Sequence, residues 1–334
     1  MIKTEITEML NIKHPIIQAG MGPFSTEKLA IAVSNAGALG LISHSGGPLM
    51  GFKKAVPEIM DDAIEEVNKH TKNTFGINVR VARAQPDAPK CIKKIIEKVK
   101  GDSNIEKKLR VIVTSAGDPR PWTKKIQSAG ILHFHVAAAT SHGKTIEKSG
   151  CDAVIASGYE AGGHIALEPV HTFVLLPEIV DTVKIPVIAA GGMCDGKSLA
   201  AALAFGAQGV QMGTRMIATI ESDFKDNYKT QFVKGVERDT TVLPGFFSPH
   251  CRYLKNKWTD ELKEKMEKGT PEDELLRFKA LGRSLAADKG DENGSLLCGM
   301  VVGRIKSVIS IKELVESTVT EAEEILKKLP GYII

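Results

Sequence analysis

The stretch AAGGMCDGKS at 189–198 carries the spacing Gly-x-x-x-x-Gly-Lys-Ser of a nucleotide-binding P-loop. In a P-loop, backbone N–H groups surround a phosphate, the lysine pairs with that phosphate, and the hydroxyl binds magnesium. A P-loop opens its domain near the first strand, whereas here six strand–helix units precede the motif. We therefore expect Gly191 and Gly192 to bind a phosphate, and Lys197 to match the pattern by accident. The alternatives are a P-loop phosphotransferase and glycines that serve only tight turns.

A second candidate site is the stretch ASGYEAGGH at 156–164. Gly162 and Gly163 have no side chains, so the backbone there can approach a flat ligand closely. His164 follows them, and a histidine can exchange a proton near neutral pH. Its position at the mouth of a barrel would make it the candidate catalytic residue, whereas the alternative is a surface or packing histidine. Glu160 in the same loop either orients a neighbour or is solvated.

Three further segments place polar side chains beside small residues at the ends of apolar runs. They are QAGM at 18–21, GIN at 76–78 and TSAG at 114–117. Hydrogen-bonding groups next to glycine suit a large planar heterocycle with many polar edges. Gln18 and Asn78 are the candidates for such contacts, and the alternative is that both are satisfied core amides.

Neither the histidines nor the cysteines show the spacing of a metal site. His133 and His135 alternate along one apolar run, so both face the same way, and at least one is expected to be structural. The remaining histidines form no ligand triad, and the five cysteines contain no Cys-x-x-Cys pair. We therefore expect no metal, and free thiols in a reducing compartment.

Eight short apolar runs must position these segments. Each lacks strict alternation, which is typical of a parallel strand buried on both faces, and each is followed by a helix-like segment. The runs are 14–20, 38–43, 74–79, 109–115, 131–137, 151–157, 185–191 and 208–214. They predict an α/β fold, a TIM (β/α)8 barrel, with an open doubly wound sheet as the alternative. A barrel binds ligands at the carboxyl ends of its strands, and phosphates after strands seven and eight, which here are followed by Gly191 and Gly213.

The segment 220–284 interrupts this alternation of strands and helices. It begins with polar residues, passes through the turn-rich LPGFFSPH, and continues in the charged helical stretches WTDELKEKMEKG and PEDELLRFKALG. We predict a helical lid over the barrel, whose charges form a solvated face. Residues 1–219 and 285–334 would then form the barrel domain.

Composition excludes several classes of protein. The 334 residues carry a formal net charge of +4, spread along the chain, so nucleic acid is not an expected partner. No stretch approaches the length of a membrane span, and the start MIKTEITEML lacks the apolar core of a signal peptide. We expect a cytoplasmic protein that acts on a small molecule. A homodimer is possible.

Seven motifs in order resemble one known family. They are HPIIQAGM, NAGALGLIS, FGINV, TSAGDP, YEAGGH, IPVIAAGGMCDGKS and VQMGTR. Together they resemble the FMN-dependent nitronate monooxygenase family, formerly called 2-nitropropane dioxygenases, which includes flavin-dependent enoyl-ACP reductases and NADH:quinone reductases. The resemblance covers nearly the whole chain and implies a TIM barrel with FMN bound at its top and a helical lid.

The resemblance also implies roles for individual residues. His164 matches the family's active-site histidine, beside the flavin. The residues implied to bind FMN are Gln18, Ala19, Gly20, Met21, Asn78, Ser115, Gly162 and Gly163 around the ring, with Gly191, Gly192, Gly213 and Thr214 at the phosphate. Ser157, Cys298 and Met300 depart from the family pattern, so one flavin contact and the substrate pocket are expected to differ.

The activity implied first is oxidation of alkyl nitronates with dioxygen, in which the substrate reduces the flavin. The alternative is a reductase of enoyl thioesters or quinones, in which NADH or NADPH reduces the flavin. In both, the redox chemistry belongs to the cofactor, while the protein orients the substrate and moves protons.

Overall fold

The computed structural model describes residues 1–22, 25–44, 53–83, 85–245 and 250–333. Eight parallel strands form one sheet in the order β1-β9-β8-β6-β5-β4-β3-β2. Their bounds are β1 (Ile16–Gln18), β2 (Gly40–Ile42), β3 (Phe75–Arg80), β4 (Leu109–Ser115), β5 (Leu132–Ala137), β6 (Ala153–Ser157), β8 (Val187–Ala190) and β9 (Gly209–Met212). Seven of the eight runs predicted from the sequence contain one of these strands, and the run 74–79 contains all of β3 except Arg80.

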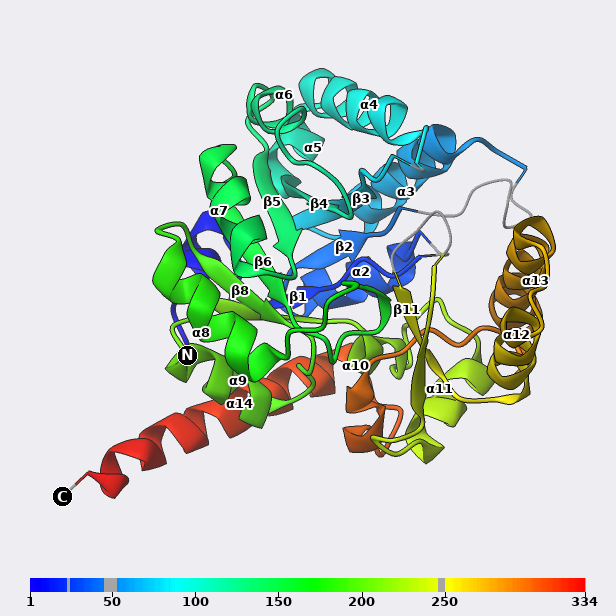
Figure 1. Ribbon diagram of the computed structural model, residues 1–334. Helices are drawn as coiled ribbons and strands as arrows, with labels where there is room; N and C mark the ends of the chain where they lie inside the picture. The colour runs from blue at the N-terminus through cyan, green and yellow to red at the C-terminus, as the bar shows by residue number, and fades with distance from the viewer. Residues whose placement is uncertain (23–24, 45–52, 84, 246–249, 334) are drawn as a thin grey trace.

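The sheet closes into a barrel between β1 and β2 (Figure 1). Ile17 forms a parallel bridge with Leu39. The N–H of Gln18 donates to the carbonyl of Leu39 at 2.9 Å, and the N–H of Leu39 donates to Ile16 at 2.9 Å. These bonds join the two end strands, so the prediction of a TIM barrel is confirmed and the open sheet is excluded.

Apolar side chains fill the inside of the barrel. One buried cluster combines Ile17, Leu41, Phe134 and Ile188 with side chains of the other strands. The short helix α1 (Glu5–Leu10) adds two fully buried side chains, among them Leu10, to the same cluster. Its first turn is held by a capping box at Thr4, so α1 closes the amino-terminal end of the barrel and leaves the opposite end for a ligand.

Helices surround the barrel. They are α2 (Glu27–Asn35), α3 (Val56–His70), α4 (Ala88–Gly101), α5 (Ser103–Lys108), α6 (Thr123–Gln127), α7 (Thr140–Lys148), α8 (Thr172–Thr182), α9 (Gly196–Ala204) and α14 (Ile311–Lys328). After β9 the chain forms only the one-turn helix α10 (Thr214–Ile217). The C-terminal helix α14 packs on α9 and α2, and so covers the gap that α10 leaves in the ring (Figure 1).

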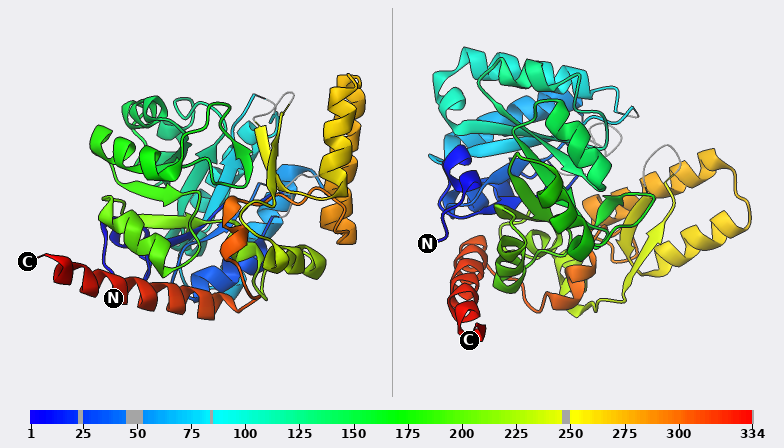
Figure 2. Two further views of the ribbon diagram at one scale, coloured as in Figure 1. Left: turned by 60° about the horizontal axis from the view of Figure 1, so that its bottom comes forward. Right: turned by 60° about the vertical axis from the view of Figure 1, so that its left-hand side comes forward.

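The inserted segment contains helices and strands. Its elements are α11 (Asp226–Lys234), β10 (Thr240–Leu243), β11 (His250–Leu254), α12 (Lys257–Glu267) and α13 (Glu272–Ser284). Figure 2 shows α12 and α13 standing beside the barrel as a pair. The division of the chain at 219/220 and 284/285 stays a prediction.

A second sheet, which the sequence did not predict, connects the insertion to the barrel. It has the order β10-β11-β7, and β7 (Gly163–Ile165) lies in the connection between β6 and α8. The remaining turns are η2 (Leu285–Lys289), η3 (Met300–Arg304) and η4 (Leu329–Tyr332). Across the described ranges, no helix combines the length and apolarity needed to cross a membrane.

Candidate active site

A cavity of about 840 Å³ opens at the carboxyl ends of the barrel strands. Its size is ordinary for a cofactor or ligand site. Every site residue predicted from the sequence lines this cavity except Gln18. The lining set comprises Ala19, Gly20, Met21, Asn78, Ser115, Gly162, Gly163, His164, Gly191, Gly192, Gly213 and Thr214.

Gln18 belongs to the wall between β1 and β2 instead. Its side chain is 0% exposed. Its Nε2 donates to the carbonyl of Leu41 at 2.8 Å and to Thr26 Oγ1 at 3.2 Å, and its Oε1 accepts from the N–H of Leu41 at 3.2 Å. The structure therefore assigns Gln18 the role of a satisfied core amide, the alternative that the sequence left open.

Glycines line the cavity where β8 and β9 end. Gly191 and Gly192 have φ values of +78° and +84°, a backbone conformation that favours glycine. A Cβ on Gly191 would lie 2.6 Å from the carbonyl oxygen of Gly158, which excludes any side chain. Thr214 Oγ1 accepts from the N–H of Gly299 at 2.8 Å, so its own proton is available to a ligand. Exposed backbone groups and a hydroxyl at this edge suit a phosphate.

The second half of the P-loop match has no phosphate site. The N–H of Ser198 donates to Asp195 Oδ1 at 3.0 Å, and the N–H of Gly196 donates to Glu321 Oε2 of α14 at 2.8 Å. Both amides therefore already have carboxylate partners. Lys197 is exposed and lies outside the cavity wall. The alternative of a P-loop phosphotransferase is wrong, because the groups that would hold its nucleotide cap α9 and join it to α14.

His164 projects from β7, opposite Cys251 of β11 in the antiparallel ladder. Its side chain is exposed to the cavity rather than packed. Partial loss of hydration inside the cavity, followed by the charges of Arg80, Arg283 and Lys279, lowers the pKa of His164 to about 4. At neutral pH the imidazole is therefore uncharged, with one N–H donor and one acceptor nitrogen.

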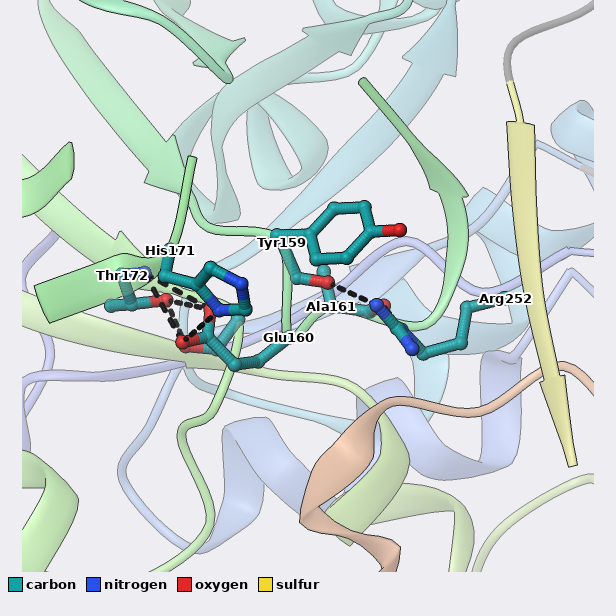
Figure 3. A network of polar contacts seen from close by, with 7 residues as sticks. Tyr159, Glu160, Ala161, His171, Thr172 and Arg252 are labelled. Atoms are coloured by element: carbon teal, nitrogen blue, oxygen red, sulfur yellow. Dashed lines mark hydrogen bonds and ion pairs between the residues drawn. The ribbon is translucent and has the colours of Figure 1, made fainter. Parts of the chain in front are cut away.

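Glu160 holds the loop before β7 against the start of α8 (Figure 3). Its carboxylate accepts from the N–H and the Oγ1 of Thr172, at 3.0 and 2.7 Å, and from His171 Nδ1 at 3.2 Å. Burial acts in the opposite direction, but these hydrogen bonds lower the pKa of Glu160 overall. Thr172 Oγ1 also lies 2.8 Å from the carbonyl of Gly191. Glu160 thus orients its neighbours, one of the two roles that the sequence allowed.

Arg252 of β11 holds the same loop from the other side (Figure 3). Its Nε donates to the carbonyl of Ala161 at 3.1 Å, and its Nη2 donates to that of Tyr159 at 2.8 Å. Its Nη1 donates to Thr240 Oγ1 at 3.0 Å, and the guanidinium lies 4.7 Å from the centre of the Tyr159 ring. Arg252 is 4% exposed. Sequence reasoning missed this residue, because a single arginine in an insertion has no diagnostic spacing.

His133 and His135 share one hydroxyl in the barrel wall. Thr114 Oγ1 lies 2.7 Å from His133 Nε2 and 2.6 Å from His135 Nδ1. The prediction that both rings face the same way is confirmed. Burial lowers the pKa of His133 to about 3 and that of His135 to about 4, so both are neutral and structural at pH 7.

One group of potential metal ligands borders the cavity. His44, Asp87 and Cys91 offer ligand atoms within 4.8 Å of one another. His44 Nδ1 accepts from the N–H of Arg80 at 3.2 Å, so the proton on Nε2 is donated to Asp87 at 2.9 Å. Burial raises the pKa of the Cys91 thiol to about 12, which disfavours the thiolate that a metal needs. These contacts explain the cluster as a hydrogen-bonded support for the end of β3.

The model of the nitronate monooxygenase family matches residues 3–321, which is nearly the whole chain. The chain belongs to this family. The match includes every strand of the barrel, the inserted segment and the loop that carries His164, so the family assignment covers the cavity as a whole.

Individual relatives agree with the family assignment. Over 295 residues the chain is 34% identical to a protein of Staphylococcus aureus named "Probable nitronate monooxygenase", covering 78% of this chain and 81% of that one. It is 36% identical over 241 residues to the (3aS,4S,5R,7aS)-5-hydroxy-7a-methyl-1-oxo-octahydro-1H-indene-4-carboxyl-CoA dehydrogenase of Rhodococcus jostii, covering 72% of this chain and 62% of that one. The structure of FabK from Thermotoga maritima matches with a TM-score of 0.89 and 36% identity, covering 100% of both chains. The protein is an oxidoreductase.

Proposed function

We propose that this protein is an FMN-dependent oxidoreductase that oxidises alkyl nitronates with dioxygen. The observation that carries the proposal is the pairing, in one cavity, of a glycine edge at β8 and β9 with an uncharged imidazole at His164. The first of these suits the phosphate of a nucleotide, and the second suits an anionic substrate. Both belong to a member of the nitronate monooxygenase family.

The residues present fit FMN. A Cβ on Gly20 would lie 2.3 Å from the side chain of Asn78, so the backbone there lies directly against a polar side chain of β3. Gly192 and Gly213 would meet nothing closer than 3.8 and 3.5 Å, which leaves room beside them. In this proposal the β8 and β9 glycines and Thr214 hold the phosphate, and the ends of β1 and β3 hold the ring. When bound, FMN supplies the two-electron redox chemistry that no side chain provides.

The state of His164 favours a nitronate over a neutral nitroalkane. A base whose pKa is about 4 removes a carbon-bound proton poorly. A nitronate has already lost that proton and carries a negative charge on its oxygens. The N–H of a neutral imidazole can donate to one of those oxygens, and the nearby cations stabilise the charge. His164 therefore binds and orients the nitronate, and its second nitrogen remains able to accept a proton.

A second candidate is an NADH- or NADPH-dependent reductase of enoyl thioesters. The observation that favours it is the match to FabK over the full length of both chains, since FabK-like proteins are enoyl-ACP reductases. The relative from Rhodococcus jostii is likewise named for a carboxyl-CoA compound. The two candidates differ in what reduces the flavin, which is the nitronate in one and the nicotinamide nucleotide in the other.

Anaerobic stopped-flow absorbance on the FMN-loaded protein distinguishes them. We expect ethylnitronate alone to bleach the flavin, roughly 100-fold or more faster than nitroethane does, because His164 is a weak base. His164→Ala should slow the reaction with ethylnitronate about tenfold by removing one hydrogen bond to a charged group. His70→Ala, on the outer helix α3, serves as the matched control. Bleaching by NADH or NADPH but not by nitronates would replace the first function with the second.

A further inference from the structure

Arg80 is a half-buried cation whose Nε has no protein partner in the part of the chain that the structure describes. It ends β3 and lines the cavity. Its Nε is fully buried and has no hydrogen-bond partner, and within the described ranges the guanidinium forms no ion pair. An unpaired charge removed from water is unfavourable, and such groups in a binding cavity commonly mark where a ligand supplies the missing partner.

Arg252 and Arg215, which are buried, are both hydrogen-bonded. Arg252 donates to two carbonyls and a hydroxyl, and Arg215 donates to the carbonyl of Ser307 at 3.1 Å. Asp87 is the acid whose charge acts on Arg80. However, its carboxylate is bonded to His44 Nε2 at 2.9 Å and forms no ion pair with Arg80. Arg110 Nε is likewise buried without a partner, but Arg110 does not line the cavity, and its Nη2 donates to the carbonyl of Met9 at 3.1 Å. What distinguishes Arg80 is that its unpaired donor belongs to a residue of the cavity wall.

Two more cations, both on the insertion, act electrostatically on His164 although neither lines the cavity. Lys279 and Arg283 lie on α13, and Lys279 Nζ donates to the carbonyl of Pro244 at 2.6 Å. Together with Arg80 they lower the pKa of His164, so their positive charges act at the imidazole. No acid contributes to this shift. The region beside His164 is thus electropositive on the side that faces β3 and α13.

This region is separate from the glycine edge. In the closed barrel β3 lies four strands from β8, on the opposite side. A nucleotide phosphate held at Gly191 and Gly213 would lie across the barrel from Arg80, whose guanidinium forms no ion pair with the described residues. The anion that pairs with Arg80 must therefore come from another group in the cavity, and the substrate bound beside His164 is the component that can bring one.

We propose that Arg80, supported by Lys279 and Arg283, binds an anionic group at the non-reacting end of the substrate, a carboxylate or a phosphate. The guanidinium offers paired N–H donors that match either oxyanion. This proposal rests on the proposed function only in that the substrate occupies the cavity beside His164. It assigns the cavity a direction, with the reacting group at His164 and the charged group between β3 and α13.

Titration with unreactive anions tests the site without turnover. Succinate represents the carboxylate and inorganic phosphate the phosphate, and their binding to the FMN-loaded protein is followed by the flavin difference spectrum. We expect at least one of them to bind, and Arg80→Met to weaken that binding about 10- to 100-fold. Arg80→Lys should restore part of it. Arg277 also lies on α13 and pairs with Asp273 at 3.4 Å. Arg277→Met therefore removes one positive charge at a position outside the proposed site, and it should leave anion binding unchanged.

The kinetic counterpart compares propionate 3-nitronate with propyl-1-nitronate, which has the same chain length but no carboxylate. Arg80→Met should lower kcat/KM for the first about 10- to 100-fold and leave the second within about threefold. Equal losses with both substrates, anion binding unaffected by Arg80→Met, or loss of FMN from that variant would each overturn the proposal. If nitronates do not react at all, the proposed function fails while the anion titration still decides the role of Arg80.

Discussion

Replacing Arg252 with methionine tests whether the insertion holds the loop that carries His164. The change keeps the length of the side chain and removes three donated hydrogen bonds, to Tyr159, Ala161 and Thr240. Two backbone carbonyls then lose a charged donor. Each hydrogen bond to a charged group contributes about 1.5–3 kcal/mol, but burial of the guanidinium, which lowers its pKa, offsets part of the sum. We expect a net loss of about 3 kcal/mol in the free energy of unfolding.

The substitution should lower both the stability of the whole protein and the order of the loop that carries His164. Differential scanning fluorimetry should show a thermal midpoint lower by roughly 5 °C. FMN affinity, measured by recovery of free-flavin fluorescence on dilution, should fall about tenfold, because the loop must be ordered again on binding. Arg252→Lys should be intermediate, since an ammonium cannot reach both carbonyls with the geometry of a guanidinium.

Arg238→Met, at an exposed arginine of the same insertion, is the control for loss of charge. If Arg252→Met retains the thermal midpoint and FMN affinity of Arg238→Met, the guanidinium does not hold the loop, and the position of His164 must be set by β7 and Glu160 alone.

Three further outcomes are expected. Gly191→Ala should abolish FMN retention on gel filtration, because its Cβ would lie 2.6 Å from a backbone carbonyl oxygen; an FMN-loaded variant would contradict the assigned phosphate edge. Lys197→Ala should leave FMN content unchanged, whereas Ser198→Ala should lower stability by about 1 kcal/mol through the lost capping box of α9, as urea unfolding would show. Burial lowers the pKa values of His133 and His135 from 6.5 to about 3 and 4. Below pH 6.5 these two histidines therefore bind protons in the unfolded chain but not in the folded chain. The free energy of unfolding should therefore fall between pH 6.5 and 4, by about 1.4 kcal/mol per pH unit for each histidine, and a flat profile in urea titrations would refute the assignment.

The barrel was predictable because its strands carry a strong local signal. Runs such as LRVIVTS and IPVIAAG are apolar on both faces, and the glycine-ended helices between them set a regular period. The cavity followed from the same reasoning, since a barrel presents the ends of all its strands at one face. This is why Asn78, Gly191 and Gly213 meet there although they are far apart in the chain.

What the sequence did not predict depends on contacts between distant segments. β7 has three residues, one of them Gly163, and it exists because β11 pairs with it almost ninety positions later. Arg80 and Arg252 are single basic residues whose environments are set by tertiary packing, so no spacing marks them. The side chain of Gln18 lies in the barrel wall for a related reason, because a polar side chain at a strand end can face either the cavity or the neighbouring strand.

The strand β7 has a consequence for how this scaffold can change. The position of an imidazole on an unpaired loop would depend only on the conformation of that loop. His164 instead lies in β7, which pairs with β11, so its position also depends on β11. Substitutions in one contiguous stretch of about 65 residues, 220–284, can therefore shift the reactive group and the cations of α13 together. The part of the cavity built on β8 and β9, where we propose that the phosphate of FMN binds, lies outside this stretch. Grafting that stretch from one relative to another is thus a direct way to re-specialise the enzyme while its coenzyme chemistry stays the same.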